Sequence, residues 1–268
     1  MTNNNDNSNL KMPSLFLAHG SPMMAIEDSA YTSFLKSLGE SLKPKAIVIF
    51  SAHFENEITT VSVHDNTYDT IYDFYGFPKE MYQCKYLAKG SSFIGNYVCD
   101  RLEENGLNVQ KENKRGLDHG SWVLLMKLFP QANVPVVQVS VNPRGDAKLH
   151  YEIGKSLRGL GDQGVLVIGS GVTVHNLRTL RWGQDKAEPW AVAFDEFLVE
   201  NIQSNRLDNL LNWESLAPNA RMAVPTPEHF LPLFVALGAS ASDDISHTKI
   251  INRHYEAGTA SYLSFNFN

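Results

Sequence analysis

The architecture can first be inferred from the stretch Ser14-Leu15-Phe16-Leu17-Ala18-His19-Gly20-Ser21-Pro22. A short apolar run that ends in turn residues is typical of a strand buried on both faces, as in a parallel sheet covered by helices. Three further runs share this pattern: Ala46–Ser51, Val134–Val141 and Val165–Ile168. The sequence therefore predicts a sheet whose central strands are buried on both faces.

Helical spacing occurs between and after these runs. Three stretches each place their apolar residues on one helical stripe: Tyr31, Phe34, Leu35 and Leu38; Phe93, Ile94, Tyr97, Val98 and Leu102; Trp190, Phe194, Phe197 and Leu198. This alternation predicts a single three-layer α/β/α domain with a mixed, mostly parallel central sheet. The segments 249–256 and 261–267 are expected to add antiparallel strands. We expect residues 1–11 to form a disordered polar tail and residues 12–268 to form one folded domain.

Composition excludes several classes of protein. The chain has 268 residues, of which 43% are hydrophobic and 19% charged, so a packed core is expected rather than disorder. The net charge of −6 and the lack of a basic run argue against nucleic-acid binding. No apolar run approaches the roughly eighteen residues that cross a bilayer, and no secretory signal is visible. Cys84 and Cys99 form no disulfide framework, which favours the reducing cytoplasm.

Several histidines stand where a sheet of this kind binds ligands. In open α/β sheets, ligands bind beyond the carboxyl ends of the strands. His19 follows one predicted strand directly, His53 follows the next by two residues, and His175 follows a third after a short loop. We therefore expect these three imidazoles at one edge of the sheet.

Two more histidines are expected at helix starts. In Pro225-Thr226-Pro227-Glu228-His229, Thr226 is expected to cap a helix and Pro227 to open it, so His229 would lie in the first turn. In Asp118-His119-Gly120-Ser121-Trp122, His119 opens another predicted helix. The four remaining histidines lack such a context and are expected on the surface or in loops: His64, His150, His247 and His254.

Convergent imidazoles indicate a metal site, because neutral imidazole is the commonest metal ligand. A site of several histidines without cysteine suits zinc, iron, copper or nickel. Glu55 and Glu228 lie close in sequence to two of the histidines, and either carboxylate could bind the metal or orient a ring as a hydrogen-bond acceptor.

From Pro13 to Leu263 the chain resembles the class III extradiol ring-cleavage dioxygenases, in the branch similar to 4,5-DOPA dioxygenase. Six ordered blocks carry the resemblance: 19–22 (HGSP), 51–53 (SAH), 73–78 (DFYGFP), 116–122 (GLDHGSW), 174–178 (VHNLR) and 225–229 (PTPEH). The resemblance implies an α/β/α fold and an enzyme that opens a catechol ring beside its paired hydroxyls, using a divalent metal and O2.

The resemblance also implies roles for individual histidines. His19, His53 and His229 are expected to bind the metal. His175 is expected either to act as the acid/base histidine or to serve as a fourth ligand, and His119 to steady substrate or oxygen. The better-studied class III enzymes use two histidines and a glutamate, whereas here His229 stands next to Glu228, which weakens the facial-triad argument for iron.

Catechol chemistry supports these roles. A catechol must lose a proton to chelate a metal, and an imidazole with an ordinary pKa of about 6.5 is suited to accept it. We expect His175 to accept this proton, with His119 as the second candidate. Zinc has no redox chemistry, so we expect Fe(II) for turnover and Zn(II) in the purified protein.

Substrate contacts are expected from two segments. The aromatic-rich stretch 72–78 is too rich in turn residues for a helix, and we expect Phe74, Tyr75 and Phe77 to line the pocket, where aromatic faces suit a flat ring. Arg178 is expected to pair with a substrate carboxylate or, equally, to form a structural salt bridge.

Two alternatives remain open at this point. A zinc-dependent hydrolase would need Glu228 or Glu55 as its base. A non-catalytic, peptide-binding relative predicts lost histidines, and none of the five is lost here. A small catechol and O2 are the expected partners, and the protein is expected to be a monomer or homodimer.

Overall fold

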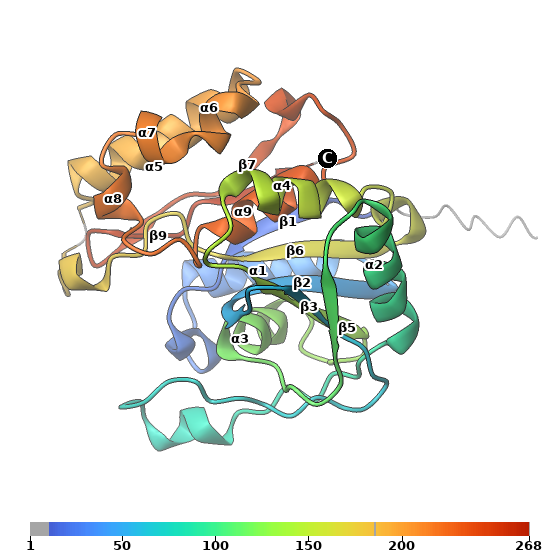
Figure 1. Cartoon of the computed structure of the whole chain (residues 1–268). Coiled ribbons are helices and arrows are strands. Elements are labelled where there is room, and N and C mark those ends of the chain that lie inside the picture. The colour runs from blue at the N-terminus through green and yellow to red at the C-terminus, as the bar shows by residue number, and fades with distance from the viewer. Residues whose placement is uncertain (1–10, 185, 268) are drawn as a thin grey trace, which may run out of the picture.

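The computed structural model describes residues 11–184 and 186–267, so the tail predicted for residues 1–11 lies outside the described part of the chain except for Lys11. Within that part, eight strands form one sheet in the order β4-β3-β5-β2-β6-β1-β10-β7 (Figure 1). Their bounds are β1 Ser14–Ala18, β2 Ala46–Glu55, β3 Thr59–Ser62, β4 Val109–Glu112, β5 Val136–Val141, β6 Val165–Gly171, β7 Lys249–Asn252 and β10 Ser264–Phe267.

The centre of this sheet is parallel and its edges are mixed. β5, β2, β6 and β1 pair in parallel, β10 joins β1 in antiparallel, and β7 continues the antiparallel edge. The predicted single α/β domain with a mixed, mostly parallel sheet is confirmed. The C-terminal strands are antiparallel as expected, but each breaks in two: β8 (Tyr255–Glu256) and β9 (Ala260–Ser261) leave the sheet as a separate pair.

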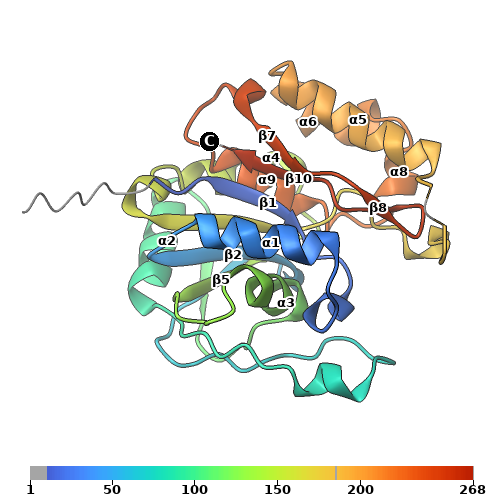
Figure 2. The same cartoon turned by 180° about the vertical axis from the view of Figure 1, so that it is seen from behind.

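Helices cover both faces of the sheet, as Figures 1 and 2 show from opposite sides. Their bounds are α1 Ala30–Ser41, α2 Ser92–Glu104, α3 His119–Leu128, α4 Ala147–Ser156, α5 Pro189–Gln203, α6 Leu207–Leu211, α7 Trp213–Leu216, α8 Ala220–Ala223 and α9 Leu231–Gly238. Short 3-10 turns lie at η1 Pro22–Ala25, η2 Lys79–Gln83, η3 Gly161–Gln163, η4 Leu177–Thr179 and η5 Ile245–His247. Each of the three predicted helical stripes falls within one of α1, α2 and α5.

Alternate residues of the central strands pack against opposite helical layers. Ile47 and Ile49 of β2 lie in the cluster that contains α1 and α3, whereas Val48 and Phe50 lie in the cluster that contains α2, α4 and α9. All four side chains are completely buried. Strands buried on both faces are therefore apolar along their whole length, which is why their sequence pattern was readable.

Two of the four histidines that were expected on the surface or in loops are buried. His150 lies in α4 with no exposed surface, where its Nε2 accepts from the Asn142 amide at 3.1 Å and its Nδ1 lies 2.8 Å from the Asp146 carbonyl. His64 lies in the loop after β3, as expected, although it is only 9% exposed. For His150 the prediction was wrong, because a ring bonded to nearby backbone can be buried without a metal.

No helix in the described residues is both long and apolar enough to span a bilayer.

Candidate functional site

His19, the first of the predicted metal ligands, directly follows the end of a central strand. β1 ends at Ala18, and the amide of His19 still donates to the Gly171 carbonyl of β6 at 3.2 Å. Gly20 then adopts a φ of +56°, and a Cβ there would lie 2.6 Å from the Tyr262 hydroxyl oxygen. Glycine is therefore required for the turn that leaves His19 at the edge of the sheet.

The second histidine projects from an irregular part of its strand. β2 runs on to Glu55, so His53 lies within the strand and not after it as the sequence suggested. The ladder to β5 is interrupted between Ser51 and Glu55. The backbone of His53 bonds elsewhere: its amide donates to Ser51 Oγ at 3.2 Å, and its carbonyl accepts from Arg115 Nη2 at 2.9 Å. Such a bulge re-aims a side chain next to a functional site.

The third histidine lies in a turn before a helix. α9 begins at Leu231, so the prediction that Thr226 caps a helix containing His229 was wrong. The Thr226 hydroxyl instead donates to Glu228 Oε1 at 2.9 Å. The carbonyl of His229 accepts from the Val172 amide at 2.8 Å, which ties the turn to the end of β6.

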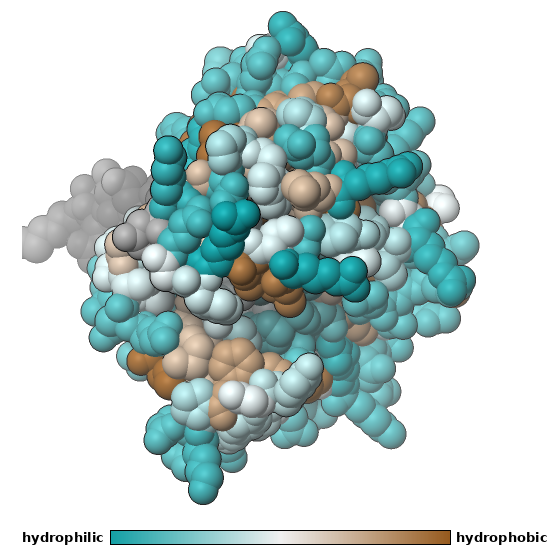
Figure 3. Space-filling view, turned by 90° about the vertical axis from the view of Figure 1, so that its left-hand side faces the viewer, coloured by the Kyte–Doolittle hydropathy of each residue, from teal (hydrophilic) through white to brown (hydrophobic). Residues whose placement is uncertain are grey.

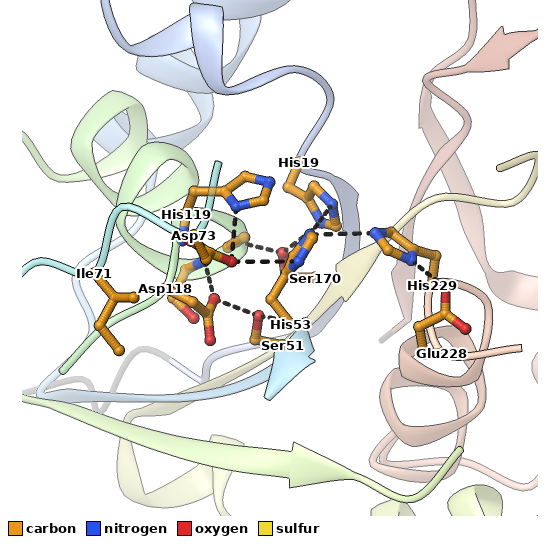
Figure 4. Close-up of polar contacts among 12 residues, drawn as sticks. His19, Ser51, His53, Ile71, Asp73, Asp118, His119, Ser170, Glu228 and His229 are labelled. Atoms are coloured by element: carbon orange, nitrogen blue, oxygen red, sulfur yellow. Dashed lines mark hydrogen bonds and ion pairs between the residues drawn. The ribbon is translucent and has the colours of Figure 1, made fainter. Parts of the chain in front are cut away.

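These three rings converge through their Nε2 atoms (Figure 4). His53 Nε2 lies 3.3 Å from His19 Nε2 and 3.2 Å from His229 Nε2. The Nδ1 atoms face acceptors: Ser170 Oγ at 3.2 Å from His19, Asp73 Oδ2 at 3.4 Å from His53, and Glu228 Oε1 at 2.9 Å from His229. The Ser170 hydroxyl hydrogen is itself donated to the Gly120 carbonyl at 2.5 Å, so its oxygen is free to accept. All three Nδ1 atoms therefore carry hydrogens, and three Nε2 lone pairs point at one another.

Burial keeps these rings neutral. It lowers the pKa of His19 and His229 well below the usual 6.5, and each neighbouring imidazole lowers it further. The pKa of His53 falls to about 3, chiefly through burial and the nearby His119. A neutral imidazole with a free lone pair is the form that binds metals.

The donor set fits a divalent metal ion. Two nitrogens held at about 2.0–2.1 Å from one ion at tetrahedral angles lie about 3.3 Å apart, which matches the measured separations. Three convergent lone pairs repel unless a cation lies between them. The ring–carboxylate contacts of His53 and His229 are the outer partners that metal-binding histidines usually have.

The other two predicted histidines flank this group without joining it. His175 stacks on His229, with ring centroids 3.5 Å apart and planes 14° apart, and its amide donates to the Ala223 carbonyl at 2.9 Å. His119 is the first residue of α3, as predicted, and its ring centroid lies 3.9 Å from that of His53. The structure thus brings all five histidines together. The ligand atoms of His19, His53 and His229 form one group that could hold a metal, and two further groups join His53 with Asp73 and His119, and His229 with Glu228 and His175.

Asp73 was not identified from the sequence as a site residue. Its Oδ1 accepts from the His119 amide at 2.9 Å, and its Oδ2 lies 3.0 Å from His119 Nδ1. Burial alone would raise the pKa of Asp73, but hydrogen bonding from His119 and the nearby imidazoles lower it to about 2, so the carboxylate is charged. Nothing in its local spacing distinguished it from a loop aspartate.

A buried polar network under His53 was also missed. Asp118, which has no exposed surface, accepts from Ser51 Oγ at 2.6 Å and from Arg115 Nη2 at 3.0 Å. It also caps α3 through the Ser121 amide at 3.1 Å. The cap was predictable from sequence spacing, but the contacts with Ser51 and Arg115 were not. The network holds the bulge of β2 against the start of α3.

The expected substrate-binding residues lie in different surroundings. Phe74 packs edge-on to His119 at 5.8 Å between centroids and to Phe77 at 5.2 Å. Tyr75 is 92% exposed and packs against no core cluster. Arg178 is exposed in η4 and forms no ion pair with any described residue, so the alternative of a structural salt bridge finds no support there. Figure 3 shows the side of the molecule that lies at the left in Figure 1, where hydrophobic residues lie among hydrophilic ones.

Comparison with known families identifies the family of this chain. A family model described as the catalytic LigB subunit of aromatic ring-opening dioxygenase matches residues 13–264. The chain belongs to the LigB family. Membership confirms the predicted class of enzyme, an extradiol ring-cleavage dioxygenase.

Several relatives of this LigB-family chain carry a more specific name. The 4,5-DOPA dioxygenase extradiol of Beta vulgaris is 43% identical, covering 94% of this chain and 95% of its own length. The protein of the same name from Mirabilis jalapa is 38% identical at the same coverage, and that from Escherichia coli is 40% identical over 87% of this chain and 86% of its own length. A crystal structure of an uncharacterized Escherichia coli K12 protein superposes with a TM-score of 0.81 and 34% identity, covering 96% of this chain and all of that one.

Proposed function

We propose that the protein opens the ring of a DOPA-like catechol with O2, at a divalent metal held by His19, His53 and His229. The observation that carries this proposal is the convergence of three neutral Nε2 atoms, two of whose separations are 3.2 and 3.3 Å. The substrate class rests on the names of relatives that are 38–43% identical. Ferrous iron, when bound, supplies a Lewis acid for the catechol oxygens and the electron that dioxygen requires.

His175 is our proposed acid/base residue. Burial lowers its pKa, a change that Glu228 opposes, so the ring is neutral near pH 7 and able to accept a catechol proton. Its ring lies parallel to that of His229 at 3.5 Å. Lone pairs in the planes of two parallel rings do not meet at one point, which favours the acid/base role over that of a fourth ligand. The proton gained by His175 is available again when the ring opens.

The substrate would be held by groups outside the metal ligands. Phe74 and Phe77 offer ring edges and faces to a flat catechol, worth about 0.5–1.5 kcal/mol per aromatic pair beyond area burial. Arg178, exposed three residues after His175, is proposed to pair with a carboxylate on the substrate. Tyr75, with 92% of its surface exposed, would need the loop to move before it could contribute.

A zinc hydrolase is disfavoured by the family match, because the model that matches residues 13–264 is described as a subunit of aromatic ring-opening dioxygenase. The two carboxylates that could serve as its base are Glu228, whose Oε1 accepts from Thr226 and His229, and Glu55, which is exposed at the end of β2. The non-catalytic, peptide-binding alternative is disfavoured because all five histidines are present and clustered.

Anaerobic reconstitution tests the proposal. Apo-protein loaded with Fe(II) or with Zn(II) is mixed with DOPA, caffeate or protocatechuate, and O2 is then admitted. The expected result is a yellow ring-opened product and O2 uptake with the iron form alone. Equal cleavage by the zinc form would contradict the choice of iron, and O2-independent hydrolysis of an ester would favour the hydrolase.

A further inference from the structure

The loop that carries the aromatic stretch 72–78 is docked on the start of α3. The Ile71 amide donates to the Leu117 carbonyl at 2.8 Å, and the Leu117 amide donates to the Asp69 carbonyl at 2.9 Å. The indole nitrogen of Trp122 donates to the Ile71 carbonyl at 3.0 Å. These contacts fix the backbone two residues before Asp73 and so deliver its side chain to the amino end of α3.

Both oxygens of Asp73 face donors. Oδ1 accepts from the His119 amide at 2.9 Å, where the dipole of the ten-residue helix α3 favours an anion. Oδ2 lies 3.0 Å from His119 Nδ1 and 3.4 Å from His53 Nδ1. Figure 4 shows this oxygen between the two rings. The Asp73 side chain is only 25% exposed, so water screens these contacts weakly.

A shared anionic oxygen determines where the ring hydrogens lie. A carboxylate only accepts, so each ring that faces it places its hydrogen on Nδ1. His53 is then left with a lone pair on Nε2, the atom that faces His19 and His229. The buried Nδ1 of His119 has no other hydrogen-bond partner among the described residues, so Asp73 Oδ2 at 3.0 Å is the acceptor that it faces, and the lone pair of His119 is left on Nε2.

We propose that Asp73 is a positioning residue that orients His53 for the metal and His119 for the substrate through one carboxylate. This inference rests on the proposed metal site. Because Asp73 stands between Tyr72 and Phe74, it also ties the aromatic stretch to the metal ligands. His119 is thereby held as a hydrogen-bond acceptor, suited to a substrate hydroxyl.

Asparagine at this position cannot reproduce the arrangement. It keeps one acceptor oxygen and replaces the other with an NH2 group, which would face an N–H of a ring or of the backbone. One of the two rings must then turn or change tautomer. Loss of such an outer partner typically weakens metal binding by about 10- to 100-fold.

The test measures metal binding and ring tautomer without turnover. Apo forms of the wild type, Asp73→Asn and Asp73→Glu are titrated with Zn(II) against a chelator. Asp65→Asn is the matched control, because Asp65 lies in the same loop and accepts from Ser92 at 2.8 and 2.6 Å without contacting any of the five clustered histidines. The proposal expects Asp73→Asn to bind Zn(II) about 10- to 100-fold more weakly, Asp73→Glu to recover part of that loss, and the control to bind like the wild type.

Nitrogen-15 NMR of the zinc-loaded protein reports directly which ring nitrogen carries hydrogen. His53 and His119 are expected to carry hydrogen on Nδ1, and His119 is expected to lose that preference in Asp73→Asn. Hydrogen on Nε2 of His119 in the wild type, or wild-type Zn(II) affinity in Asp73→Asn, would overturn the proposal. If both readouts hold and no catechol is cleaved, the proposed function fails while the role of Asp73 stands.

Discussion

Replacement of Gly120 by alanine tests how closely α3 packs on the metal ligands. A Cβ at this position would lie 2.8 Å from Ser51 Oγ and 2.9 Å from His53 Cδ2, closer than real Cβ contacts. In an unconstrained helix the same change is favourable by about 1 kcal/mol. Overpacking in a core costs about 1–3 kcal/mol. The apo-protein should therefore be destabilised by about 0–2 kcal/mol.

The same substitution should lower the metal affinity more than it lowers the stability of the apo-protein. Cδ2 of His53 is bonded to Nε2, so a ring displaced by the new methyl group carries its ligand atom away from those of His19 and His229. We expect metal affinity to fall at least about tenfold, equivalent to about 1.4 kcal/mol. Urea unfolding of the apo-protein and competition titration with Zn(II) measure the two effects separately.

Gly95→Ala is the matched control for this substitution. Gly95 lies in α2, and a Cβ there would come 2.5 Å from the Ser62 carbonyl oxygen, away from the histidines. This control should lose stability while keeping its metal affinity. Wild-type metal affinity in Gly120→Ala, or equal affinity losses in the two variants, would refute the reasoning.

Three further predictions concern the histidines and the charges around them. His175→Ala should retain metal by elemental analysis and lose turnover, whereas His19→Ala should lose both; metal loss in the first variant would make His175 a ligand. Arg115→Ala removes the charge partner of the fully buried Asp118 carboxylate, so the free energy of unfolding of the apo-protein in urea should fall by about 2–4 kcal/mol. Arg144→Ala, which breaks an exposed ion pair, should lower it by less than about 1 kcal/mol, and similar losses in the two variants would contradict this. Burial lowers the pKa of His150 to about 4, so between pH 6.5 and 4 this ring gains a proton only in the unfolded chain. Over this interval the wild type should therefore lose roughly 3 kcal/mol more stability than His150→Asn, and parallel stability profiles of the two proteins would contradict this.

The sequence predicted those features that depend on local pattern and on general rules of sheet topology. β1 was predicted with its observed bounds, because a strand buried on both faces is apolar throughout. His19 and His53 were placed at one edge because parallel strands carry their carboxyl ends to the same side. The start of α3 at His119 was predicted from the segment Asp118-His119-Gly120-Ser121-Trp122, and the structure adds that Asp118 caps it.

Features that depend on distant contacts were not readable. Asp73 becomes a site residue only when the loop docks on α3, 46 positions away along the chain. Arg115 bonds the carbonyl of His53 across 62 positions. The edge strand β4, with the sequence VQKE, is too short and polar to show a strand pattern. His229 was assigned to a helix because the Thr-Pro pair resembles a helix start, but Thr226 bonds Glu228 instead.

The central claim is that one divalent ion is bound by the Nε2 atoms of His19, His53 and His229. Crystals of the Fe(II)-loaded protein, grown without oxygen and measured on both sides of the iron absorption edge, test it most directly. The account predicts a single anomalous peak within about 2.3 Å of all three Nε2 atoms. A peak at other residues, or none between these rings at full iron loading, would contradict it.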